Sequence, residues 1–272
     1  MTTNNSAPAA AAPAASAGGS ASAERLFAQI FRRLTMEWNR ISNFREVSQL
    51  GLHEATQKLY ERNAEIIRHS LSDPEMRKLF TDPDAFISEG HAAAAPRELT
   101  RKAAGDFTSS VDAASLVFAH SLLDSSLQDC CRLCAILAPS DWVPTIRDRK
   151  TSIGQIIDTS VKDVIDELIS ADLERLERES LLKKSDRMFS LCPPPAGFVA
   201  IQGFNFDRAR LLALDELRHN AVHSNDQHKF LPNGEDDLLF LQRSGLYVWR
   251  LINAKHGIRL YSEDVFGSGS NR

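Results

Sequence analysis

The sequence has few of the residues that interrupt helices. Only 13 of its 272 residues are glycine and 11 are proline, and several of these fall within the first twenty positions. Long periodic stretches with so few breakers favour an all-α fold. Because 43% of the residues are hydrophobic, the chain is long enough to bury a sizeable core in one or two domains.

The chain also lacks an excess of positive charge. Its formal net charge is −4, so any contact with nucleic acid must come from a local arrangement of charged side chains. This composition argues against a salt-sensitive DNA-binding protein of high affinity. It is compatible with an enzyme that touches RNA briefly at one phosphate.

A secretory leader and long apolar runs are missing as well. Residues 1–22 consist largely of Ala, Ser, Pro, Thr, Asn and Gly, with no basic start and no Leu-rich centre. We expect a disordered tail there. No apolar run approaches the length of about 18 residues that a membrane-spanning helix needs. These features predict a soluble, cytoplasmic protein that makes no membrane contact.

Cysteine is scarce, and three of the four cysteines, Cys130, Cys131 and Cys134, lie close together; the fourth is Cys192. A cluster on one expected helix is poorly placed for a disulfide framework, and it indicates free thiols in a reducing compartment. A zinc site would need a second cluster of ligands at a suitable spacing, and the sequence shows none. We therefore expect no metal and no cofactor.

Apolar residues recur at helical spacing in the first half of the chain. A helix starting after Ser22 is expected to end or bend at Gly51, and a second is expected over 52–71. Asp-Pro and Ala-Pro pairs within 72–106 predict short turns and a domain boundary. The apolar positions from Ser109 to Leu137 alternate spacings of four and three, which predicts a helix packed against near-antiparallel neighbours. These seam positions are Leu116, His120, Leu123, Leu127, Cys130, Cys134 and Leu137.

Three further helices are expected in the second half. The first runs from about Thr151 towards Phe189, the second from Asn205 or Asp207 to about Asn220, and the third from about Asp236 to His256. Helices that each carry one apolar stripe pack most simply as an up-down bundle. We therefore expect a tail (1–22), a helical N-terminal region (23–106), a four-helix bundle (107–260) and a flexible C-terminus (261–272).

A short polar stretch at the end of the expected 205–220 helix carries chemistry. Arg218 and His223 are expected to emerge close together where this helix gives way to a polar loop. A guanidinium is permanently cationic and binds phosphate oxygens in a forked manner, whereas an imidazole exchanges protons near pH 7. The two groups suffice to cleave RNA without a metal, because the imidazole can take the proton of a ribose 2′-hydroxyl while the guanidinium stabilises charge on the phosphate.

The hexapeptide Arg218-His219-Asn220-Ala221-Val222-His223 resembles the Arg-x4-His signature of the HEPN domain family, and the helix order over 107–257 is similar to that fold. The resemblance implies a metal-independent endoribonuclease with Arg218 and His223 catalytic and His219 supporting them. Asn220 and Asp215 are the expected neighbours of this site. It also implies a homodimer in which two motifs face each other, and a place in a toxin–antitoxin or defence system with an antitoxin or regulatory protein as partner.

Two other interpretations remain open. In the first, Arg218 pairs with Asp215 or Glu216 and His223 caps the helix, and the protein is a non-catalytic helical module that dimerises or binds a partner. In the second, Asp215, His219 and His223, spaced four apart, bind a metal together with His228. Asn220 stands where a metallohydrolase needs a glutamate, and the helix is expected to end before His223, so this interpretation is weaker.

His120 lies on the apolar seam, and a lone histidine there is usually a hydrogen-bonded core residue. We therefore leave it outside the expected site. The segment 205–229 carries equal numbers of opposite charges and is no basic patch.

Overall fold

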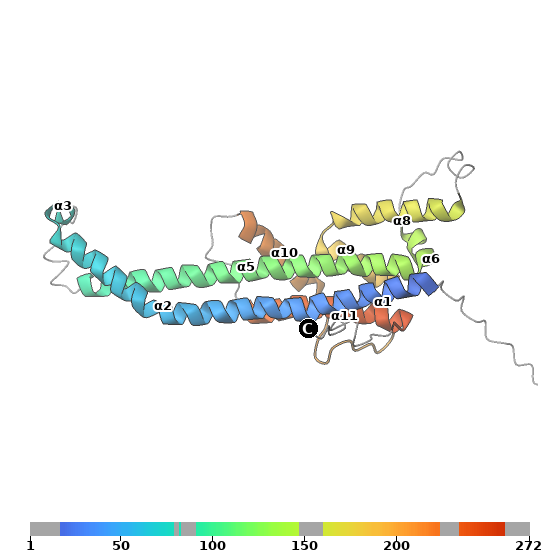
Figure 1. Cartoon of the computed structure of the whole chain (residues 1–272), viewed down its shortest axis with the longest axis horizontal. Coiled ribbons are helices and arrows are strands. Elements are labelled where there is room, and N and C mark those ends of the chain that lie inside the picture. Colours follow the sequence, from blue (N-terminus) through green and yellow to red (C-terminus); the bar gives the residue numbers. More distant parts are fainter. Residues whose placement is uncertain (1–16, 79–81, 83–90, 147–159, 224–233, 259–272) are drawn as a thin grey trace, which may run out of the picture.

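The computed structural model describes residues 17–78, 82, 91–146, 160–223 and 234–258. These residues form helices and contain no strand, which confirms the all-α helical bundle (Figure 1). Within the same residues, no helix combines the length and the apolar character needed to cross a bilayer.

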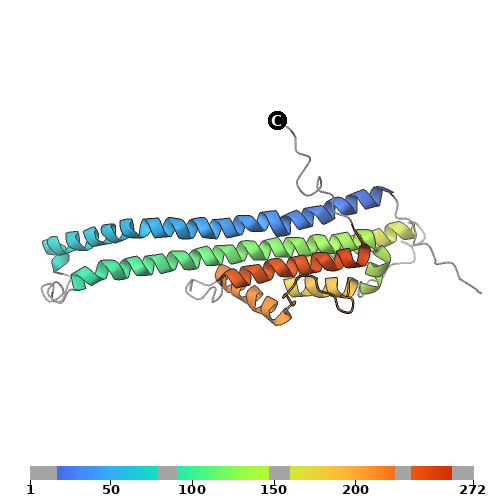
Figure 2. The ribbon, with the colours of Figure 1, turned by 90° about the horizontal axis from the view of Figure 1, so that it is seen from below.

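The N-terminal half forms a long helical hairpin. Helix α1 (Ala17–Arg32), the π-helical turn η1 (Arg33–Glu37) and α2 (Trp38–Ser72) follow one another as one rod, and α3 (Pro74–Arg77) lies at its far end. Helix α5 (His91–Leu137) returns antiparallel beside this rod (Figure 2). The expected break at Gly51 is wrong: Gly51 lies inside α2. A glycine in a helix interior costs only about 1 kcal/mol, and the packing of α2 along α5 outweighs it.

The expected division at residue 106 falls inside α5. Pro96, which was expected to mark a turn, lies in the second turn of α5 and removes one helical hydrogen bond there. Side chains of α1, η1 and α2 share one core with α5 and α11, so 23–106 does not form a core of its own. Ala17 to Ser22 belong to α1 rather than to a tail. Residues 1–16 and 261–272 lie outside the described residues.

The second half adds shorter helices against α5. They are α6 (Pro139–Trp142), the 3-10 turn η2 (Val143–Thr145), α8 (Val161–Glu177), α9 (Leu181–Leu191), α10 (Arg208–His223) and α11 (Gly234–His256). Of the single helix expected from Thr151 to Phe189, the start lies outside the described residues. The rest is two helices, because Ser180 caps a new one by accepting a hydrogen bond from the Lys183 N–H.

Helix α11 runs antiparallel to α1 and α2 and parallel to α5. Its first residue, Gly234, lies beside Arg45 and Asp112, whereas Trp249 stacks on Phe27 with ring centroids 4.4 Å apart. The Trp249 indole N–H donates a 3.0 Å hydrogen bond to the Phe27 carbonyl. These contacts fix the register of α11 along the N-terminal rod.

The π-helical turn is also held by α11. The side-chain amide of Gln242 donates a 2.9 Å hydrogen bond to the carbonyl of Leu34, inside η1. The bonding pattern of a π-turn differs from that of the helix on either side, and here a side chain of a neighbouring helix satisfies one of its carbonyls. Leu34 itself is fully buried.

The predicted seam of α5 is buried. Leu116, Leu123 and Leu127 are at most 2% exposed, and Cys130 and Cys134 are similarly covered. The connection between α8 and α9 is locked to α5 by Lys184, whose buried ammonium binds Asp124 Oδ1 at 2.7 Å and the Glu177 carbonyl at 3.0 Å. This contact positions the α8–α9 corner beside α10.

Gly245 provides a test of this packing. A Cβ at this position would lie 3.1 Å from Leu123 Cδ1 and still closer to the Leu34 side chain. We expect Gly245→Val to lower the free energy of unfolding by about 1–3 kcal/mol, because overpacking forces the surrounding core to shift. Urea titration followed by circular dichroism measures the change.

The matched control is Gly105→Val in α5, where a Cβ would meet nothing within 4 Å. It should leave stability nearly unchanged. Equal losses in the two variants would contradict the close approach of α11 to η1 and α5.

Candidate functional site

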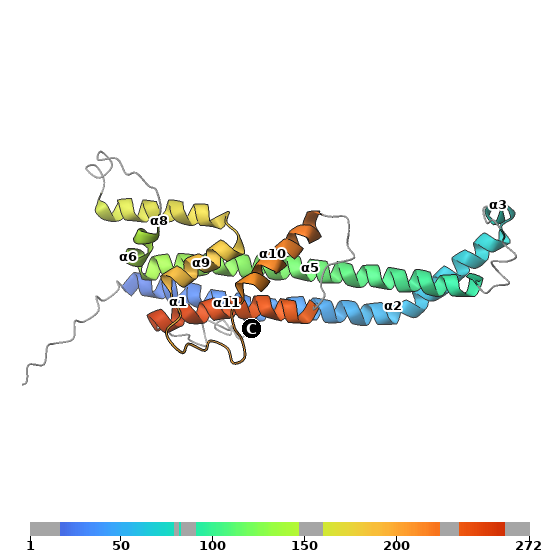
Figure 3. The ribbon, with the colours of Figure 1, turned by 180° about the vertical axis from the view of Figure 1, so that it is seen from behind.

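Helix α10 brings the candidate residues to a surface beside the middle part of α5 (Figure 3). Asp207 caps it, since its carboxylate accepts hydrogen bonds from the backbone N–H groups of Ala209 at 2.9 Å and Arg210 at 3.1 Å. Leu211 and Leu214 are buried and anchor its inner face. The helix then leaves the bundle obliquely, and its last turns project from the surface (Figure 3). Asp207 is one of the two caps that the sequence predicted.

The structure places the motif residues at different depths. Arg218 is half-buried, whereas His219, Asn220 and His223 are exposed. The helix was expected to unravel near Asn220, but it continues through His223. Arg218 and His223 are five residues apart, which in an α-helix is one full turn plus a further rotation of about 140°. Arg218 and His223 therefore do not share one face of α10.

His219 and His223 do share a face. They are one turn apart, and their ring centroids are 4.6 Å from each other at an angle of 47°. Both rings lie on the exposed side of the helix end. His219 thus links the two catalytic candidates, because its ring contacts His223 and it also lines the same cleft as Arg218.

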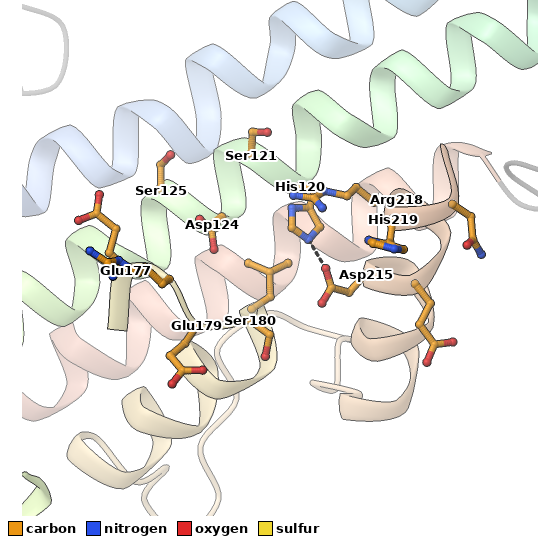
Figure 4. Close-up of a pocket in the computed structure, with 14 residues that line it drawn as sticks. His120, Ser121, Asp124, Ser125, Glu177, Glu179, Ser180, Asp215, Arg218 and His219 are labelled. Atoms are coloured by element: carbon orange, nitrogen blue, oxygen red, sulfur yellow. Dashed lines mark hydrogen bonds and ion pairs between the residues drawn. The ribbon is translucent and has the colours of Figure 1, made fainter. Parts of the chain in front are cut away.

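A cleft of about 800 Å³ opens beside α10. Its walls come from α5, from the α8–α9 corner and from α10 (Figure 4). Arg218, His219, Asn220 and Asp215 line it, and His223 does not. The cleft also contains His120, Ser121, Asp124, Ser125, Glu177, Arg178, Glu179, Ser180, Leu181 and Glu216.

A histidine–carboxylate pair lies in the wall of this cleft. His120 Nε2 is 2.7 Å from Asp215 Oδ1, and the two side chains point toward one another from α5 and α10 (Figure 4). In the non-catalytic interpretation Asp215 was a possible partner of Arg218, but in the structure it binds His120. The residue left out of the predicted site is therefore in contact with it. The polar interruption of the apolar seam at position 120 was the signal that pointed to such a partner.

Burial decides the protonation of His120. Desolvation lowers its pKa below the usual range, and the nearby Arg218 guanidinium acts in the same direction. The hydrogen bond and charge of Asp215, and the charge of Asp124, favour the imidazolium but do not prevail. A neutral His120 that donates its Nε2–H to Asp215 is consistent with this balance.

Arg218 has no hydrogen-bonded or ion-paired carboxylate within the described part of the chain. Two carboxylates of the cleft form ion pairs: Asp124 binds Lys184 at 2.7 Å, and Glu179 binds Lys183 at 2.5 Å. The lining contains more carboxylates than cations. Its acidic side chains therefore repel a polyanion, whereas Arg218 attracts one.

Metal binding by the motif is not favoured by this geometry. Although Asp215, His219 and His223 do follow one helix face, Asp215 is bound to His120. Among the described residues, the trio of potential ligands close enough to share one ion lies elsewhere. His228, the fourth ligand of that hypothesis, lies outside the described residues. All four cysteines are free thiols, as predicted, and all four are buried.

The His120–Asp215 pair predicts a pH dependence of stability. An unfolded histidine takes up a proton below pH 6.5, whereas native His120 resists protonation until a lower pH. The unfolded state then binds more protons, so the free energy of unfolding falls as the pH drops below 6.5. His120→Gln, which keeps a donor for Asp215, should flatten this part of the profile.

The measurement is urea unfolding between pH 5 and 8 together with NMR titration of the imidazole. His53→Gln, at an exposed position of α2, is the control and should leave the profile unchanged. A titration of His120 at or above pH 6.5 would contradict the dominance of burial.

No protein-family model, no curated protein and no solved structure matches the chain.

Proposed function

We propose that this protein is a metal-independent endoribonuclease of the HEPN type, with Arg218 binding the scissile phosphate and His223 acting as the base. One observation carries the proposal. Helix α10 holds Arg218 in a cleft wall with no paired carboxylate in the described part of the chain, and it carries an exposed His219–His223 pair at its tip. A cation and a proton acceptor are thus available on one short, anchored element.

The chemistry needs only these groups. His223 takes the proton of a ribose 2′-hydroxyl, and the resulting oxygen bonds to the adjacent phosphorus. The bond from phosphorus to the 5′-oxygen breaks, and that oxygen takes a proton from water. The His223 imidazolium returns its proton to the hydroxide left behind. The products are a 2′,3′-cyclic phosphate and a free 5′-hydroxyl. Arg218 stabilises the charge that develops on the phosphate oxygens, while His219 supports the orientation of His223.

The site requires a second copy of the chain. Because Arg218 and His223 lie about 140° apart around α10, one copy does not present both to the same phosphate. In a two-fold dimer, Arg218 of one copy can face His223 of the other. The exposed apolar side chains of Leu212 and Val222, which are 45% and 52% exposed on α10, would be covered by such an interface.

The acidic residues of the cleft restrict where RNA can lie. Glu177 and Glu216 would repel a phosphate chain that entered deeply. The backbone therefore passes along the rim at Arg218, His219 and Asn220. In keeping with the HEPN resemblance, we place this activity in a toxin–antitoxin or defence system of the cytoplasm, where an antitoxin or regulatory protein would restrain it.

Cleavage assays test the enzyme directly. With end-labelled RNA in EDTA, the wild-type protein should yield fragments ending in a 2′,3′-cyclic phosphate. His223→Ala should reduce the rate by about 10²–10⁴-fold, the usual contribution of a general base. Arg218→Ala should reduce it by about 10²–10³-fold, since it removes a donor to the transition state.

Matched controls are His53→Ala and Arg68→Ala, both at exposed positions of α2. They should cleave at the wild-type rate. The proposal fails if cleavage is absent, if it needs a divalent cation, or if it persists in both α10 variants.

Mixing the two inactive variants tests the shared site. A heterodimer of Arg218→Ala and His223→Ala chains contains one site with both residues intact and one with neither. Mixing equal amounts should restore about a quarter of the wild-type activity, because half of the dimers are mixed and half of their sites are complete. If the wild type is a dimer but mixing the two variants restores no activity, each site uses the residues of one chain alone.

A second candidate is a non-catalytic helical dimerisation or protein-interaction module. The observation that favours it is the apolar surface along the long hairpin. Phe44, Val47 and Leu50 of α2 are 41%, 67% and 60% exposed, and Phe107 of α5 is 44% exposed. Exposed apolar patches of this kind mark interaction surfaces. A stable dimer without cleavage of any RNA would favour this function.

A further inference from the structure

Three potential metal ligands from three helices meet at the end of the bundle away from the hairpin tip. Cys134 lies in the last turn of α5, Cys192 follows α9 directly, and His256 is the last residue of α11. Cys134 and Cys192 are 3% and 1% exposed, and His256 is half-buried. One ligand atom from each residue lies within 4.8 Å of the other two.

The spacing of the sulfurs fits a zinc ion better than a disulfide. Cys134 Sγ and Cys192 Sγ are 3.7 Å apart. Two thiolates at the usual Zn–S distance of about 2.3 Å, with a tetrahedral angle between them, lie about 3.8 Å apart. A disulfide would need a separation of about 2.05 Å. The positions of the thiols therefore match those of zinc ligands with little rearrangement.

The backbone around the three residues is well fixed. The N–H of Cys192 donates a 2.7 Å hydrogen bond to the Met188 carbonyl at the end of α9. Gly257, with φ of 63°, ends α11 immediately after His256, and its N–H bonds the Asn253 carbonyl at 2.8 Å. A left-handed glycine of this kind is a common helix stop, and it leaves His256 at a defined position.

Lys255 joins α11 to α6 and α9 next to the ligands. Its ammonium binds Asp141 of α6 at 2.5 Å and the Leu191 carbonyl at 2.6 Å. The Lys255 ammonium is therefore already paired with Asp141. Its contact with the Leu191 carbonyl also holds the segment that carries Cys192 against the end of α11.

We propose that Cys134, Cys192 and His256 form a zinc-binding site that fastens the ends of α5, α9 and α11 to one another. Zn²⁺ binds the two thiolates and a neutral imidazole, and the thiol protons are released to solvent. Three protein ligands leave the fourth tetrahedral position to water or another small ligand. The site is separate from α10, so the RNA chemistry proposed for Arg218 and His223 does not pass through it.

Metal binding by the whole chain tests the proposal. The protein is reduced, freed of metal, and titrated with Zn²⁺ against a chromophoric chelator. A second metal-free sample is titrated with Co²⁺, which reports thiolate ligation by charge-transfer absorption. We expect one ion per chain and a cobalt spectrum typical of tetrahedral thiolate coordination.

Variants assign the ligands. Cys192→Ser and His256→Ala should each weaken Zn²⁺ binding by more than the roughly 10–100-fold that follows when a metal ligand loses its hydrogen-bond partner. Cys131→Ala is the matched control, because Cys131 is buried in the same helix as Cys134 but lies outside the trio. It should bind Zn²⁺ as the wild type does. His256→Ala changes only a half-buried residue at the end of a helix, so it keeps the test interpretable should the cysteine variant fail to fold.

The proposal is overturned if the reduced wild-type chain binds neither ion, or if affinity is the same in all variants. Oxidation of the metal-free chain to a Cys134–Cys192 disulfide, with no zinc binding before oxidation, would also overturn it and would indicate a redox pair instead.

Discussion

Burial of the apolar seam of α5 is the constraint on which the other helices depend. The rod of α1, η1 and α2 covers one side of it, α11 another, and the shorter helices of the second half cover the rest. A polar group that reaches such a surface loses its water and must find a partner. His120 pairs with Asp215, and the buried Lys184 pairs with Asp124. The polar contacts that satisfy buried groups beside the seam thus also form the walls of the cleft.

This constraint separates the two ends of α10. Its first turns are fixed by the Asp207 cap, by the Arg210–Asp237 ion pair at 2.6 Å and by the buried leucines. The His120–Asp215 contact joins the middle of α10 to α5. Beyond it, Leu217 still packs against the core and Arg218 is half-buried, whereas the side chains from His219 onward are mostly exposed. The helix end can therefore meet another molecule while its position is set by the core. Such an anchored but exposed tip suits the proposed shared site.

The parts of the fold that depend on local spacing could be predicted from the sequence. The alternation of four and three from Leu116 to Cys134 identified a buried seam, and the signal at Asp207 identified a helix start. The uninterrupted course of α2 through Gly51 and of α5 through Pro96 could not be predicted in the same way, because long-range packing compensates for a weak local preference. Polar residues at 219–223 suggested an unravelled end, yet a solvated helix face has the same composition.

The contacts of the candidate sites depend on distant partners. Asp215 lies 95 positions from His120, and Cys192 lies 58 positions from Cys134. A polar residue on an apolar seam indicates that some partner exists, but its identity follows only from how the helices cross. The same holds for His256, which the sequence marked only as the end of a helix and which lies beside two thiols. Without matching relatives, the three-dimensional arrangement was needed to bring these residues together.

The π-helical turn η1 has a consequence for how the chain tolerates changes in length. It accommodates one more residue than an α-helical turn would, between the part of the rod that carries Phe27 and the part that carries Ile41. Removing one residue from η1 would convert it to an ordinary α-helical turn and would leave the buried faces of α1 and α2 in register. Removing one residue from the α-helical stretch on either side would instead rotate one part of the rod against the other by about 100°, and Phe27 would no longer face Trp249. The turn is therefore the position in the rod at which the loss of one residue disturbs the core least.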